Sequence, residues 1–428
     1  MKTLVIGSGG REHALCRALQ RSARPSLRLF CAPGNAGIGE VAQCVALGAT
    51  EVSELARFAR EQEIDLTIVG GEAPLAAGIV DEFESRGLAI AGASREAARL
   101  ESSKAFAKDF MTRHGIPTAR YRIAESAAEA RAILRGGEFG GADAHVVVKA
   151  DGLAAGKGVV VARSRAEAEG AINDLMEAGL AGAAAARRIV IEEAMTGREA
   201  SLLLFADGRD YALMPAARDH KRIGENDTGP NTGGMGAITD AAVLDEATLA
   251  QVLTEVVEPT LEGARAEGLP FRGVLFVGLM LTPEGPRVLE YNVRFGDPEA
   301  QAILVRLQSD PVDIFEAVAR GRLREVPVQW SEDSSACVVL AARGYPRRPE
   351  IGARIEGLER AAQHPGVEIF HAGTARSASG HWLTAGGRVL GVTAMAPKLE
   401  RALERCYAAA GEIHWDGMQY RRDIGKFT

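Results

Sequence analysis

The sequence predicts three consecutive parts: an N-terminal doubly wound α/β domain, a central domain on an antiparallel sheet, and a small C-terminal α+β domain. Strand-like and helix-like patterns alternate over the first hundred residues, which is typical of a parallel sheet covered on both faces. Later strand patterns are joined by turns and flank helices, and the pattern starts afresh near Pro327. The length of 428 residues fits about three domains of roughly 150 residues each. We expect these domains at residues 1–101, 102–326 and 327–428.

In the N-terminal part, four apolar runs predict strands at residues 3–6, 27–31, 66–69 and 88–91. Helical patterns follow the first run as far as Gln20 and also occupy residues 53–62. Glycine-rich turns follow the first three runs. Ligands of such sheets bind at these strand ends, so we expect part of a binding site there.

In the central part, residues 99–114 predict one helix, with Phe106 and Phe110 one turn apart and facing a core. Residues 219–237 show no apolar periodicity, and a loop of this length inside a compact domain is usually functional. Apolar runs predict strands at residues 146–148, 189–191, 202–205, 274–281 and 287–291.

In the C-terminal part, three apolar runs predict strands, and an amphipathic helix follows them. The strands are expected at residues 336–342, 368–372 and 388–394, and the helix at residues 397–412.

Composition excludes several classes of protein. Hydrophobic residues make up 46% and charged residues 25%, as in ordinary globular proteins and unlike disordered chains. No run reaches the roughly 18 apolar residues of a membrane span, and the N-terminal apolar stretch is too short for a signal peptide. The five cysteines are scattered, and the net charge is −7, which argues weakly against nucleic-acid binding. We therefore expect a cytoplasmic protein with small-molecule substrates and neither a nucleic-acid nor a membrane partner.

The turn after the first strand reads GSGGRE (residues 7–12) and begins like a dinucleotide-binding fingerprint. Glu12 occupies the third glycine position, and no acidic residue ends the second strand to bind a ribose hydroxyl, so NAD is disfavoured. Gly9 and Gly10 still allow backbone N–H groups to approach a phosphate at the helix start, with Arg11 nearby. A simple tight turn between strand and helix is the alternative.

A second glycine-rich turn follows the strand at residues 146–148. It lacks the spacing of a P-loop, and Gly158 stands where that motif has its magnesium-binding hydroxyl. Lys149 lies at the end of an apolar strand, where an unpaired ammonium would be costly to bury, so an anionic ligand is its natural partner. Such a turn can fold over phosphates as a lid. A plain hairpin with a snorkelling lysine is the alternative.

Acidic residues end the strand at residues 189–191: Glu192 and Glu193 follow it directly, and Glu199 comes soon after. Carboxylates at a strand end can accept hydrogen bonds from an amino group or from ribose hydroxyls. A solvated strand end explains them more simply.

The last strand of the central part carries the strongest chemical signal. Glu290, Asn292 and Arg294 are spaced two apart, so in a strand all three project from one face. A carboxylate and an amide oxygen suit a hard cation such as Mg²⁺, and an arginine beside them suits a transferring phosphoryl group. Asp297 and Pro298 then predict a helix start, with Asp297 as the N-cap. A polar face on an edge strand with an ordinary cap is the alternative.

The long loop at residues 219–237 begins with the cluster DHKR (residues 219–222) and then carries several glycines. A basic cluster with permissive backbone positions fits a mobile cover over an anionic substrate. A merely solvated loop would not need so many glycines.

Taken together, these motifs resemble those of the phosphoribosylamine–glycine ligases (glycinamide ribonucleotide synthetases), ATP-grasp enzymes of de novo purine synthesis. The resemblance covers essentially the entire chain, and the run at residues 227–237 is particular to this ligase among ATP-grasp enzymes. The matching runs are GGREHA (9–14), PGNAG (33–37), EAPL (72–75), SKAF (103–106), KADGLAAGKG (149–158), DHKR (219–222), residues 227–237, RFGDPE (294–299) and HAGT (371–374).

The resemblance implies an ATP-grasp fold for the central domain, with a mobile lid subdomain at about residues 118–193. It also implies ATP as a substrate, with Mg²⁺ or Mn²⁺ bound by Glu290 and Asn292. The implied nucleotide contacts are Lys104 and Lys149 on the phosphates, Gly156, Lys157 and Gly158 closing over them, Glu192 and Glu193 at the adenine pocket, and Glu199 on the ribose.

The implied reaction joins glycine to 5-phosphoribosylamine through glycyl phosphate, with Arg294, Lys149 and Asp219 as the catalytic residues. The N-terminal glycine turns and the turn at residues 296–299 would cradle the sugar phosphate, while Asp219 and Arg294 would lie near glycine. We expect a monomer. The implied substrate-binding residues are Gly9, Gly10, Arg11, Glu12, Asn35, Asp219, Lys221, Arg294, Gly296, Asp297, Pro298 and Glu299.

Three rival hypotheses remain at this point. An NAD-dependent oxidoreductase fits the N-terminal glycines but not the strand that carries Glu290. An inactive nucleotide-binding regulator fits any such fold, although the lysines and the metal ligands are all present. Another ATP-grasp ligase of the purine pathway is nearer, but residues 227–237 and 371–374 favour the glycine ligase. The chain departs from the family pattern at Gly71 and at residues 238–239, and the strand at 274–281 carries no carboxylate.

Overall fold

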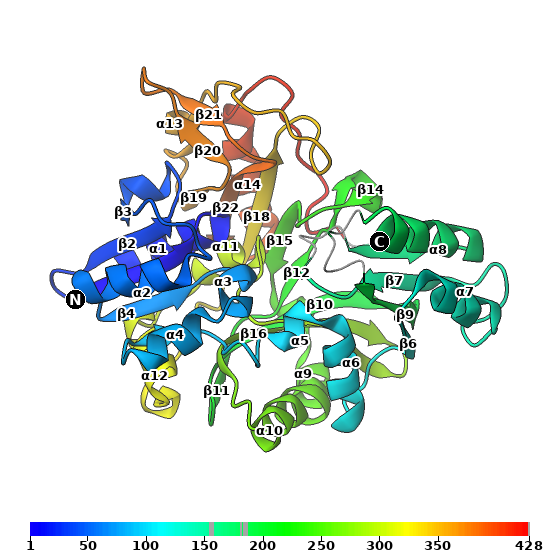
Figure 1. Ribbon diagram of the computed structural model, residues 1–428. Helices are drawn as coiled ribbons and strands as arrows, with labels where there is room; N and C mark the ends of the chain where they lie inside the picture. The colour runs from blue at the N-terminus through cyan, green and yellow to red at the C-terminus, as the bar shows by residue number, and fades with distance from the viewer. Residues whose placement is uncertain (154–157, 180–181, 183–186, 427–428) are drawn as a thin grey trace.

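The computed structural model describes residues 1–153, 158–179, 182 and 187–426. Its elements surround a long central sheet, with the N-terminal sheet on the left, a small lobe on the right and the C-terminal elements at the top (Figure 1). Within the described ranges, no helix is both long and apolar enough to cross a bilayer.

The N-terminal part is a five-stranded parallel sheet in the order β3-β2-β1-β4-β5, with helices on both faces. This arrangement confirms the predicted doubly wound domain. Successive residues of β1 serve two cores, because Leu4 and Ile6 pack with α2 and α4 while Val5 packs with α1. The strands are β1 (Lys2–Gly7), β2 (Arg28–Pro33), β3 (Gln43–Cys44), β4 (Leu66–Val69) and β5 (Ile90–Ala91), and the helices are α1 (Gly10–Gln20), α2 (Val52–Glu61), α3 (Glu72–Ala76) and α4 (Ile79–Ser85).

The prediction of one helix over residues 99–114 is wrong, because two helices form there: α5 (Arg99–Ser102) and α6 (Lys104–Arg113). Ser103 separates them with an extended backbone, φ −136° and ψ 108°. Its Oγ accepts a hydrogen bond from the N–H of Phe106 at 3.1 Å and so caps α6. Lys104 consequently becomes the first residue of α6.

The lobe on the right of Figure 1 is a four-stranded antiparallel sheet in the order β6-β9-β7-β8. Two helices cover it, and together they enclose a small core of its own. The elements are β6 (Tyr121–Ala124), α7 (Ala127–Arg135), β7 (Val146–Ala150), β8 (Val159–Ala162), α8 (Arg165–Ile172) and β9 (Ile189–Glu193). Both β7 and β9 end with the charged residues that the sequence analysis singled out.

The central sheet has nine strands, eight of them in the order β17-β16-β10-β12-β15-β18-β22-β19, and β11 pairs with β10. Its interior strands are almost wholly apolar, as β10 and β16 show. The strands are β10 (Arg198–Asp207), β11 (Tyr211–Leu213), β12 (Ala217–Asp219), β15 (Gly236–Thr239), β16 (Arg272–Thr282), β17 (Gly285–Asn292), β18 (Ser334–Ala341), β19 (Val367–His371) and β22 (Arg388–Ala396). The helices are α9 (Glu246–Val252), α10 (Glu258–Ala266), α11 (Glu299–Leu304), α12 (Pro311–Arg320), α13 (Leu358–Ala361) and α14 (Leu399–Glu412).

The C-terminal strands continue this central sheet, because β15 pairs with β18 from Gly236 opposite Val338 to Thr239 opposite Ser335. Helix α14 packs on β18 and β22. The predicted C-terminal strands and helix are therefore present, in an α+β arrangement that shares its sheet with the central part. A separate hairpin, β20 (Thr374–Arg376) and β21 (Trp382–Thr384), lies beside them.

Residues 219–237 are not the continuous loop that we predicted. They begin at the end of β12, form the hairpin β13 (Arg222–Gly224) and β14 (Thr228–Asn231), and lead into β15. Glycines obscured the strand pattern here, because pairing is carried by backbone groups and not by alternating apolar side chains.

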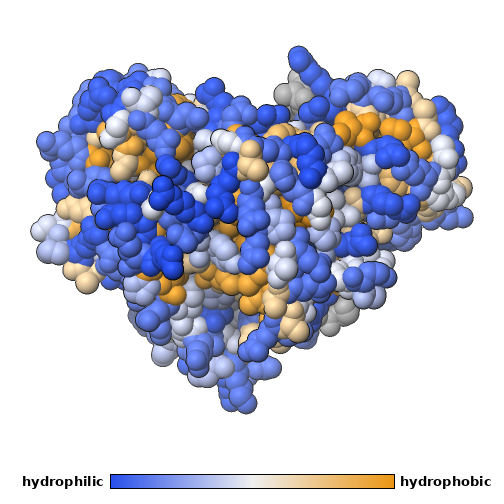
Figure 2. All heavy atoms as spheres, turned by 90° about the horizontal axis from the view of Figure 1, so that it is seen from below, coloured by the Kyte–Doolittle hydropathy of each residue, from blue (hydrophilic) through white to orange (hydrophobic). Residues whose placement is uncertain are grey.

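The face seen from below is mainly hydrophilic, with apolar side chains in separate patches (Figure 2). Among the described residues, the exposed large apolar side chains are Leu153, Val161 and Ile351. Leu153 also lines the cavity between the N-terminal sheet, the four-stranded lobe and the central sheet.

Candidate active site

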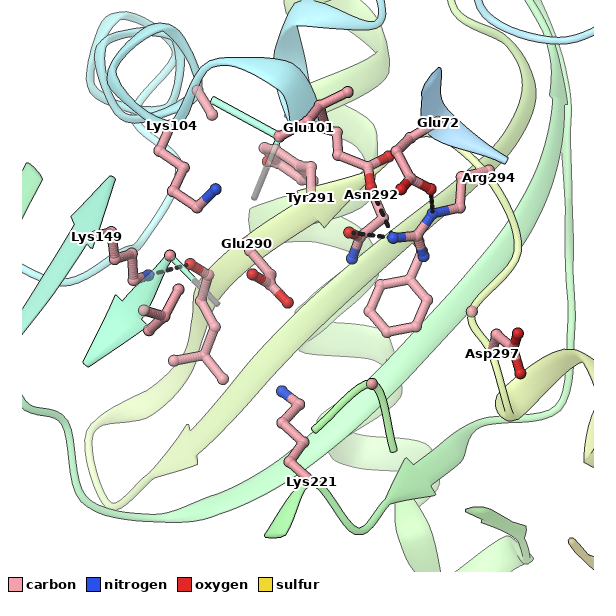
Figure 3. Close-up of a pocket in the computed structure, with 18 of the residues that line it drawn as sticks. Glu72, Glu101, Lys104, Lys149, Lys221, Glu290, Tyr291, Asn292, Arg294 and Asp297 are labelled. Carbon is pink, nitrogen blue, oxygen red and sulfur yellow. Dashed lines mark hydrogen bonds and ion pairs between the residues drawn. The ribbon is translucent and has the colours of Figure 1, made fainter. Parts of the chain in front are cut away.

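A cavity of about 470 Å³ lies where the N-terminal sheet, the four-stranded lobe and the central sheet meet (Figure 3). It collects most of the residues that the sequence analysis selected. The predicted residues in its wall are Arg11, Lys104, Lys149, Gly158, Glu192, Asp219, Lys221, Glu290, Asn292, Arg294, Gly296, Asp297 and Glu299. The predicted Gly156 and Lys157 lie outside the described residues. The other predicted residues lie in the described part of the chain but outside the cavity wall: Gly9, Gly10, Glu12, Asn35, Glu193, Glu199 and Pro298.

Two lysines form one end of the cavity. Lys104 begins α6, and its Nζ donates to the carbonyl oxygen of Gly152 at 3.2 Å. Lys149 lies on β7, and its Nζ donates to the carbonyl oxygen of Leu289 at 3.1 Å. Burial lowers the pKa of Lys104, although Glu290 opposes that effect. Both lysines line the cavity, and the Nζ of Lys149 lies 2.9 Å from the carboxylate of Glu192. An anionic ligand for Lys149 stays a prediction.

Glu192 lies at this lysine end between two ammonium groups. Its Oε1 is 2.9 Å from Lys149 Nζ, and its Oε2 is 2.9 Å from Lys108 Nζ. Glu193, the next residue of β9, points to the opposite face of the strand and pairs with Arg120 at 2.6 Å. Strand alternation therefore separates these two acids, and of the two only Glu192 reaches the cavity.

Glu290 and Asn292 occupy the middle of the cavity, at the end of β17 (Figure 3). Burial alone would raise the pKa of Glu290, but Lys221, Lys149, Lys104 and Arg294 lower it, so the carboxylate stays ionised.

The donor set at this position fits a divalent cation that takes its other ligands from phosphate and water. Among the residues described, no cluster of three or more His, Cys, Asp or Glu side chains could hold a metal by itself. An ionised carboxylate with one amide oxygen is therefore a partial site, suited to a cation that arrives with a nucleotide.

Arg294 lies beyond the end of β17, so it is not part of the strand, contrary to the prediction, although it does face the cavity. Its guanidinium is held in place by acids that the sequence analysis did not select. Nη2 lies 2.7 Å from Glu101 and donates to Asn292 Oδ1 at 3.1 Å, and Nε donates to Glu72 at 3.1 Å. These contacts fix the plane of the guanidinium beside the candidate cation ligands.

Asp219 and Lys221 enter the cavity from the central sheet. Asp219 ends β12, and the Nζ of Lys221 lies 3.0 Å from Glu199. Burial alone would lower the pKa of Lys221, but Glu199, Asp219 and Glu290 raise it well above its usual value. Burial raises the pKa of Asp219 to about 6, while Lys221 opposes that rise. Glu199 thus acts in this structure as the partner of Lys221.

In the first glycine-rich turn (residues 7–12), the side chain of Glu12 binds the backbone of the turn itself. Glu12 is buried, and its Oε2 accepts a hydrogen bond from the N–H of Gly9 at 2.6 Å. Arg11 Nε donates to Glu12 Oε1 at 2.6 Å. The N–H of Gly9 is therefore already bonded, and of this turn only Arg11 reaches the cavity. Asn35 holds the neighbouring turn, because its Nδ2 donates to the carbonyl oxygens of Ser8 and His371.

The predicted cap at Asp297 is wrong. Helix α11 begins at Glu299 after a cis Asp297–Pro298 peptide, and Pro298 is its N-cap without a side-chain hydrogen bond. Asp297 faces the cavity, where Oδ1 accepts from Gln301 and Oδ2 lies 3.2 Å from Arg388. The carboxylate of Asp297 therefore pairs with Arg388, whereas the local sequence predicted that it would cap the N-terminus of the helix.

Glu299 folds back over Gly296, where a Cβ atom would lie 2.3 Å from Glu299 Oε2, so a larger residue at position 296 would displace this carboxyl group. Burial raises the pKa of Glu299 to about 8, and the nearby charge of Asp219 adds to this effect. Burial therefore favours the protonated form of Glu299.

The sequence analysis missed several cavity residues, and one of them left a signal. Lys108 lies four residues after Lys104, so it shares a helix face with it. Tyr345 and Arg388 left no signal, because they come from the C-terminal part and reach the site only through the shared sheet. Tyr345 Oη accepts from the N–H of Gly233 at 3.0 Å, and Arg388 Nη1 donates to the Gly233 carbonyl at 2.6 Å.

Comparison with known proteins places this geometry in a family context. Family models of the three domains of phosphoribosylglycinamide synthetase match this chain. The N domain matches residues 1–101, the ATP-grasp (A) domain residues 102–300 and the C domain residues 335–427. A curated relative, the phosphoribosylamine–glycine ligase of Xanthomonas axonopodis pv. citri, is 49% identical over 428 residues, which cover 99% of this chain and 97% of that protein.

Solved structures give the same result. The crystal structure of phosphoribosylamine–glycine ligase from Thermotoga maritima has a TM-score of 0.84 at 33% identity and covers 99% of this chain and 100% of its own. The biotin carboxylase domain of 2-oxoglutarate carboxylase from Hydrogenobacter thermophilus, in complex with MgADP and bicarbonate, has a TM-score of 0.71 at 18% identity and covers 98% and 91%. The second likeness concerns the fold alone. Together with the family matches, the first confirms the resemblance inferred from the motifs.

Proposed function

Because this chain belongs to the phosphoribosylglycinamide synthetase family, we propose that it joins glycine to 5-phosphoribosylamine at the expense of ATP, in purine biosynthesis. The products are glycinamide ribonucleotide, ADP and phosphate. The observation that carries this proposal is the order of charges along one cavity. Lys104, Lys108 and Lys149 stand at one end, Glu290 and Asn292 stand in the middle, and arginines with acidic partners stand at the other end.

The lysine end binds the nucleotide. Lys104 and Lys149 contact the phosphates, and Gly158 lies in the same part of the cavity wall. Gly156 and Lys157, which the family resemblance also assigns to the phosphates, lie outside the described residues. The apolar side chains of Met111, Val159 and Leu289 also line this end and suit the flat face of a base. Glu192 borders the adenine pocket, and Glu199, whose carboxylate lies 3.0 Å from Lys221 Nζ, binds the ribose.

Glu290 and Asn292 hold a divalent cation, Mg²⁺ or Mn²⁺, that enters with the nucleotide. When bound, the cation neutralises phosphate charge and polarises the oxygens of the transferring group. Lys221, whose ammonium is kept charged by Glu199 and Asp219, faces the same region from the opposite wall.

The other end of the cavity binds glycine and the amine. Asp219, Lys221 and Arg294 face glycine, with the carboxylate of glycine directed toward the cations. Arg11 and the turn from Gly296 to Glu299 face the phosphoribosylamine, and the glycine turn at residues 9–10 supports Arg11 from behind.

The chemistry takes two steps. The carboxylate of glycine attacks the γ-phosphate of ATP, giving glycyl phosphate and ADP. The amine of phosphoribosylamine then attacks the glycyl carbon and releases phosphate. Lys149 and Arg294 offset phosphoryl charge by position alone, as is typical of phosphoryl transfer. Because glycyl phosphate hydrolyses readily, the cavity must exclude water while it persists.

The enzyme acts as a monomer in the cytoplasm, without nucleic-acid or membrane partners. All five cysteines lie in the described part of the chain as free thiols, and four are buried, which is typical of proteins from a reducing compartment. Light scattering coupled to gel filtration tests the monomer.

The deciding experiment measures ADP release with ATP, Mg²⁺, glycine and freshly generated phosphoribosylamine, and omits each component in turn. Release that requires both co-substrates, with glycinamide ribonucleotide as the product, supports the proposal. Release with a different acid in place of glycine would keep the fold and overturn the substrate. No nucleotide turnover in any combination would favour a regulatory protein.

A further inference from the structure

The lysine end of the cavity contains a carboxylate, that of Glu192, in addition to its ammonium groups. Glu192 is buried between Lys108 and Lys149, with 2.9 Å from each ammonium to one of its carboxylate oxygens. The side chains of Glu192 and Lys108 are each 2% exposed, and that of Lys149 is 7% exposed. One carboxylate therefore has two cations, and this buried cluster carries a net positive charge.

The two lysines are held differently. Lys108 Nζ also donates to Thr118 Oγ1 at 2.7 Å, and Thr118 in turn donates to the Val288 carbonyl at 2.6 Å. Burial lowers the pKa of Lys108 to about 8, while Glu192 opposes that effect, so the pair favours the charged form at neutral pH.

Lys149 lies at the same 2.9 Å from the other oxygen of this carboxylate. Among the described residues, no group donates a hydrogen bond of good geometry to Glu192 Oε1, although Lys149 Nζ lies 2.9 Å away. The ammonium of Lys149 donates to the Leu289 carbonyl instead. Each lysine thus forms an ion pair with Glu192 and donates a hydrogen bond to another acceptor: Lys108 to the side chain of Thr118, outside the cavity wall, and Lys149 to the Leu289 carbonyl.

We propose that Lys108 is a positioning residue that neutralises Glu192 and thereby frees the ammonium of Lys149 for the nucleotide phosphates. The inference rests on the nucleotide site proposed above. When Lys149 turns toward a phosphate, Glu192 keeps Lys108 as its counter-ion and is never left as an unpaired buried charge. Without Lys108, Glu192 would have Lys149 as its remaining close cation and would hold it back, because breaking a buried pair is strongly unfavourable.

A double-mutant cycle tests this role through nucleotide affinity and not only through activity. The variants are Lys108→Gln, Glu192→Gln and the double variant, with Lys108→Arg as the charge-preserving control. Glutamine keeps the size of Lys108 and a hydrogen bond to Thr118, so folding is favoured. Calorimetry with a non-hydrolysable ATP analogue and Mg²⁺ gives the dissociation constant, and ADP release gives KM and kcat.

We expect K108Q to weaken nucleotide binding about tenfold in the wild-type background and by less than about twofold in the E192Q background, because the competing carboxylate is then gone. K108R should stay close to wild type. Equal losses in both backgrounds would overturn the inference, since Lys108 would then act by direct contact or by packing. An E192Q variant without nucleotide binding would overturn it too.

The wild-type enzyme separates this inference from the proposed function. A wild-type protein that binds no nucleotide removes the proposed function itself. A wild-type protein that binds and turns over ATP, with an additive cycle, removes only the role of Lys108.

Discussion

The proton on Glu299 gives a prediction that needs no substrate. Burial, aided by Asp219, raises the pKa of Glu299 from about 4.5 to about 8. The folded protein therefore keeps a proton that the unfolded chain releases, so this group favours folding at low pH. That contribution is lost as the pH rises from about 4.5 through about 8. Replacement of Glu299 by glutamine, which imitates the protonated acid, should remove the loss.

The magnitude follows from the shift. One pKa unit corresponds to about 1.4 kcal/mol, and between about pH 5.5 and about pH 8 the wild type should lose up to about 3 kcal/mol relative to E299Q. Urea unfolding of both proteins at the two pH values gives the difference in free energy of unfolding.

The exposed Glu262 on α10 supplies the control, since E262Q removes a carboxylate of the same type outside the cavity. Its difference from wild type should not depend on pH. If the E299Q difference is the same at both pH values, the proton on Glu299 does not exist and the electrostatic account of this end of the cavity is wrong.

Further predictions concern the remaining parts of the site. Arg294→Ala should lower kcat by about 100-fold with little change in KM for ATP, because it removes a fixed cation beside the phosphoryl group; steady-state kinetics with unchanged turnover would contradict this role. Glu290→Gln should raise the Mg²⁺ concentration needed for half-maximal ADP release by at least about tenfold, whereas chelation should stop release in the wild type; an unchanged Mg²⁺ curve would rule out Glu290 as a ligand. Arg388→Met should raise KM for phosphoribosylamine by about tenfold without a comparable change for ATP, because Arg388 joins the carbonyls of Gly233 and Asp297. Equal increases for both substrates would point to general destabilisation instead.

The sequence allowed the parallel N-terminal sheet and the charged strand ends to be predicted, because both depend on short-range patterns. The alternation of side chains along a strand predicted that Glu290 and Asn292 lie on the same face of β17. The position of Lys149 at the end of an apolar strand predicted that it belongs to a site. The prediction that Asp297 caps a helix was wrong because its carboxylate pairs with Arg388, which lies 91 residues later in the sequence. Serine is a common N-cap, so Ser103 could have indicated the start of a second helix. The helical pattern on both sides of it favoured one continuous helix instead.

Other features had no local cause. No sequence pattern near residue 327 predicts that β15 pairs with β18, because strand pairing depends on the whole sheet. Tyr345 and Arg388 join the cavity as a consequence of that pairing. Lys108 could have been selected from its spacing to Lys104, but spacing alone does not identify Glu192 as its partner.

The junction between β15 and β18 has a consequence for attempts to divide the chain. A fragment that stops before β18 would end its sheet at β15, whose four residues are all buried in the full chain. Their open N–H and C=O groups would then form an unprotected sheet edge, which readily recruits a strand from another molecule. The segment that begins at β18 therefore protects the nucleotide-binding part from self-association. Expression of residues 1–326 alone should yield aggregates, and co-expression with residues 327–428 should restore a soluble complex.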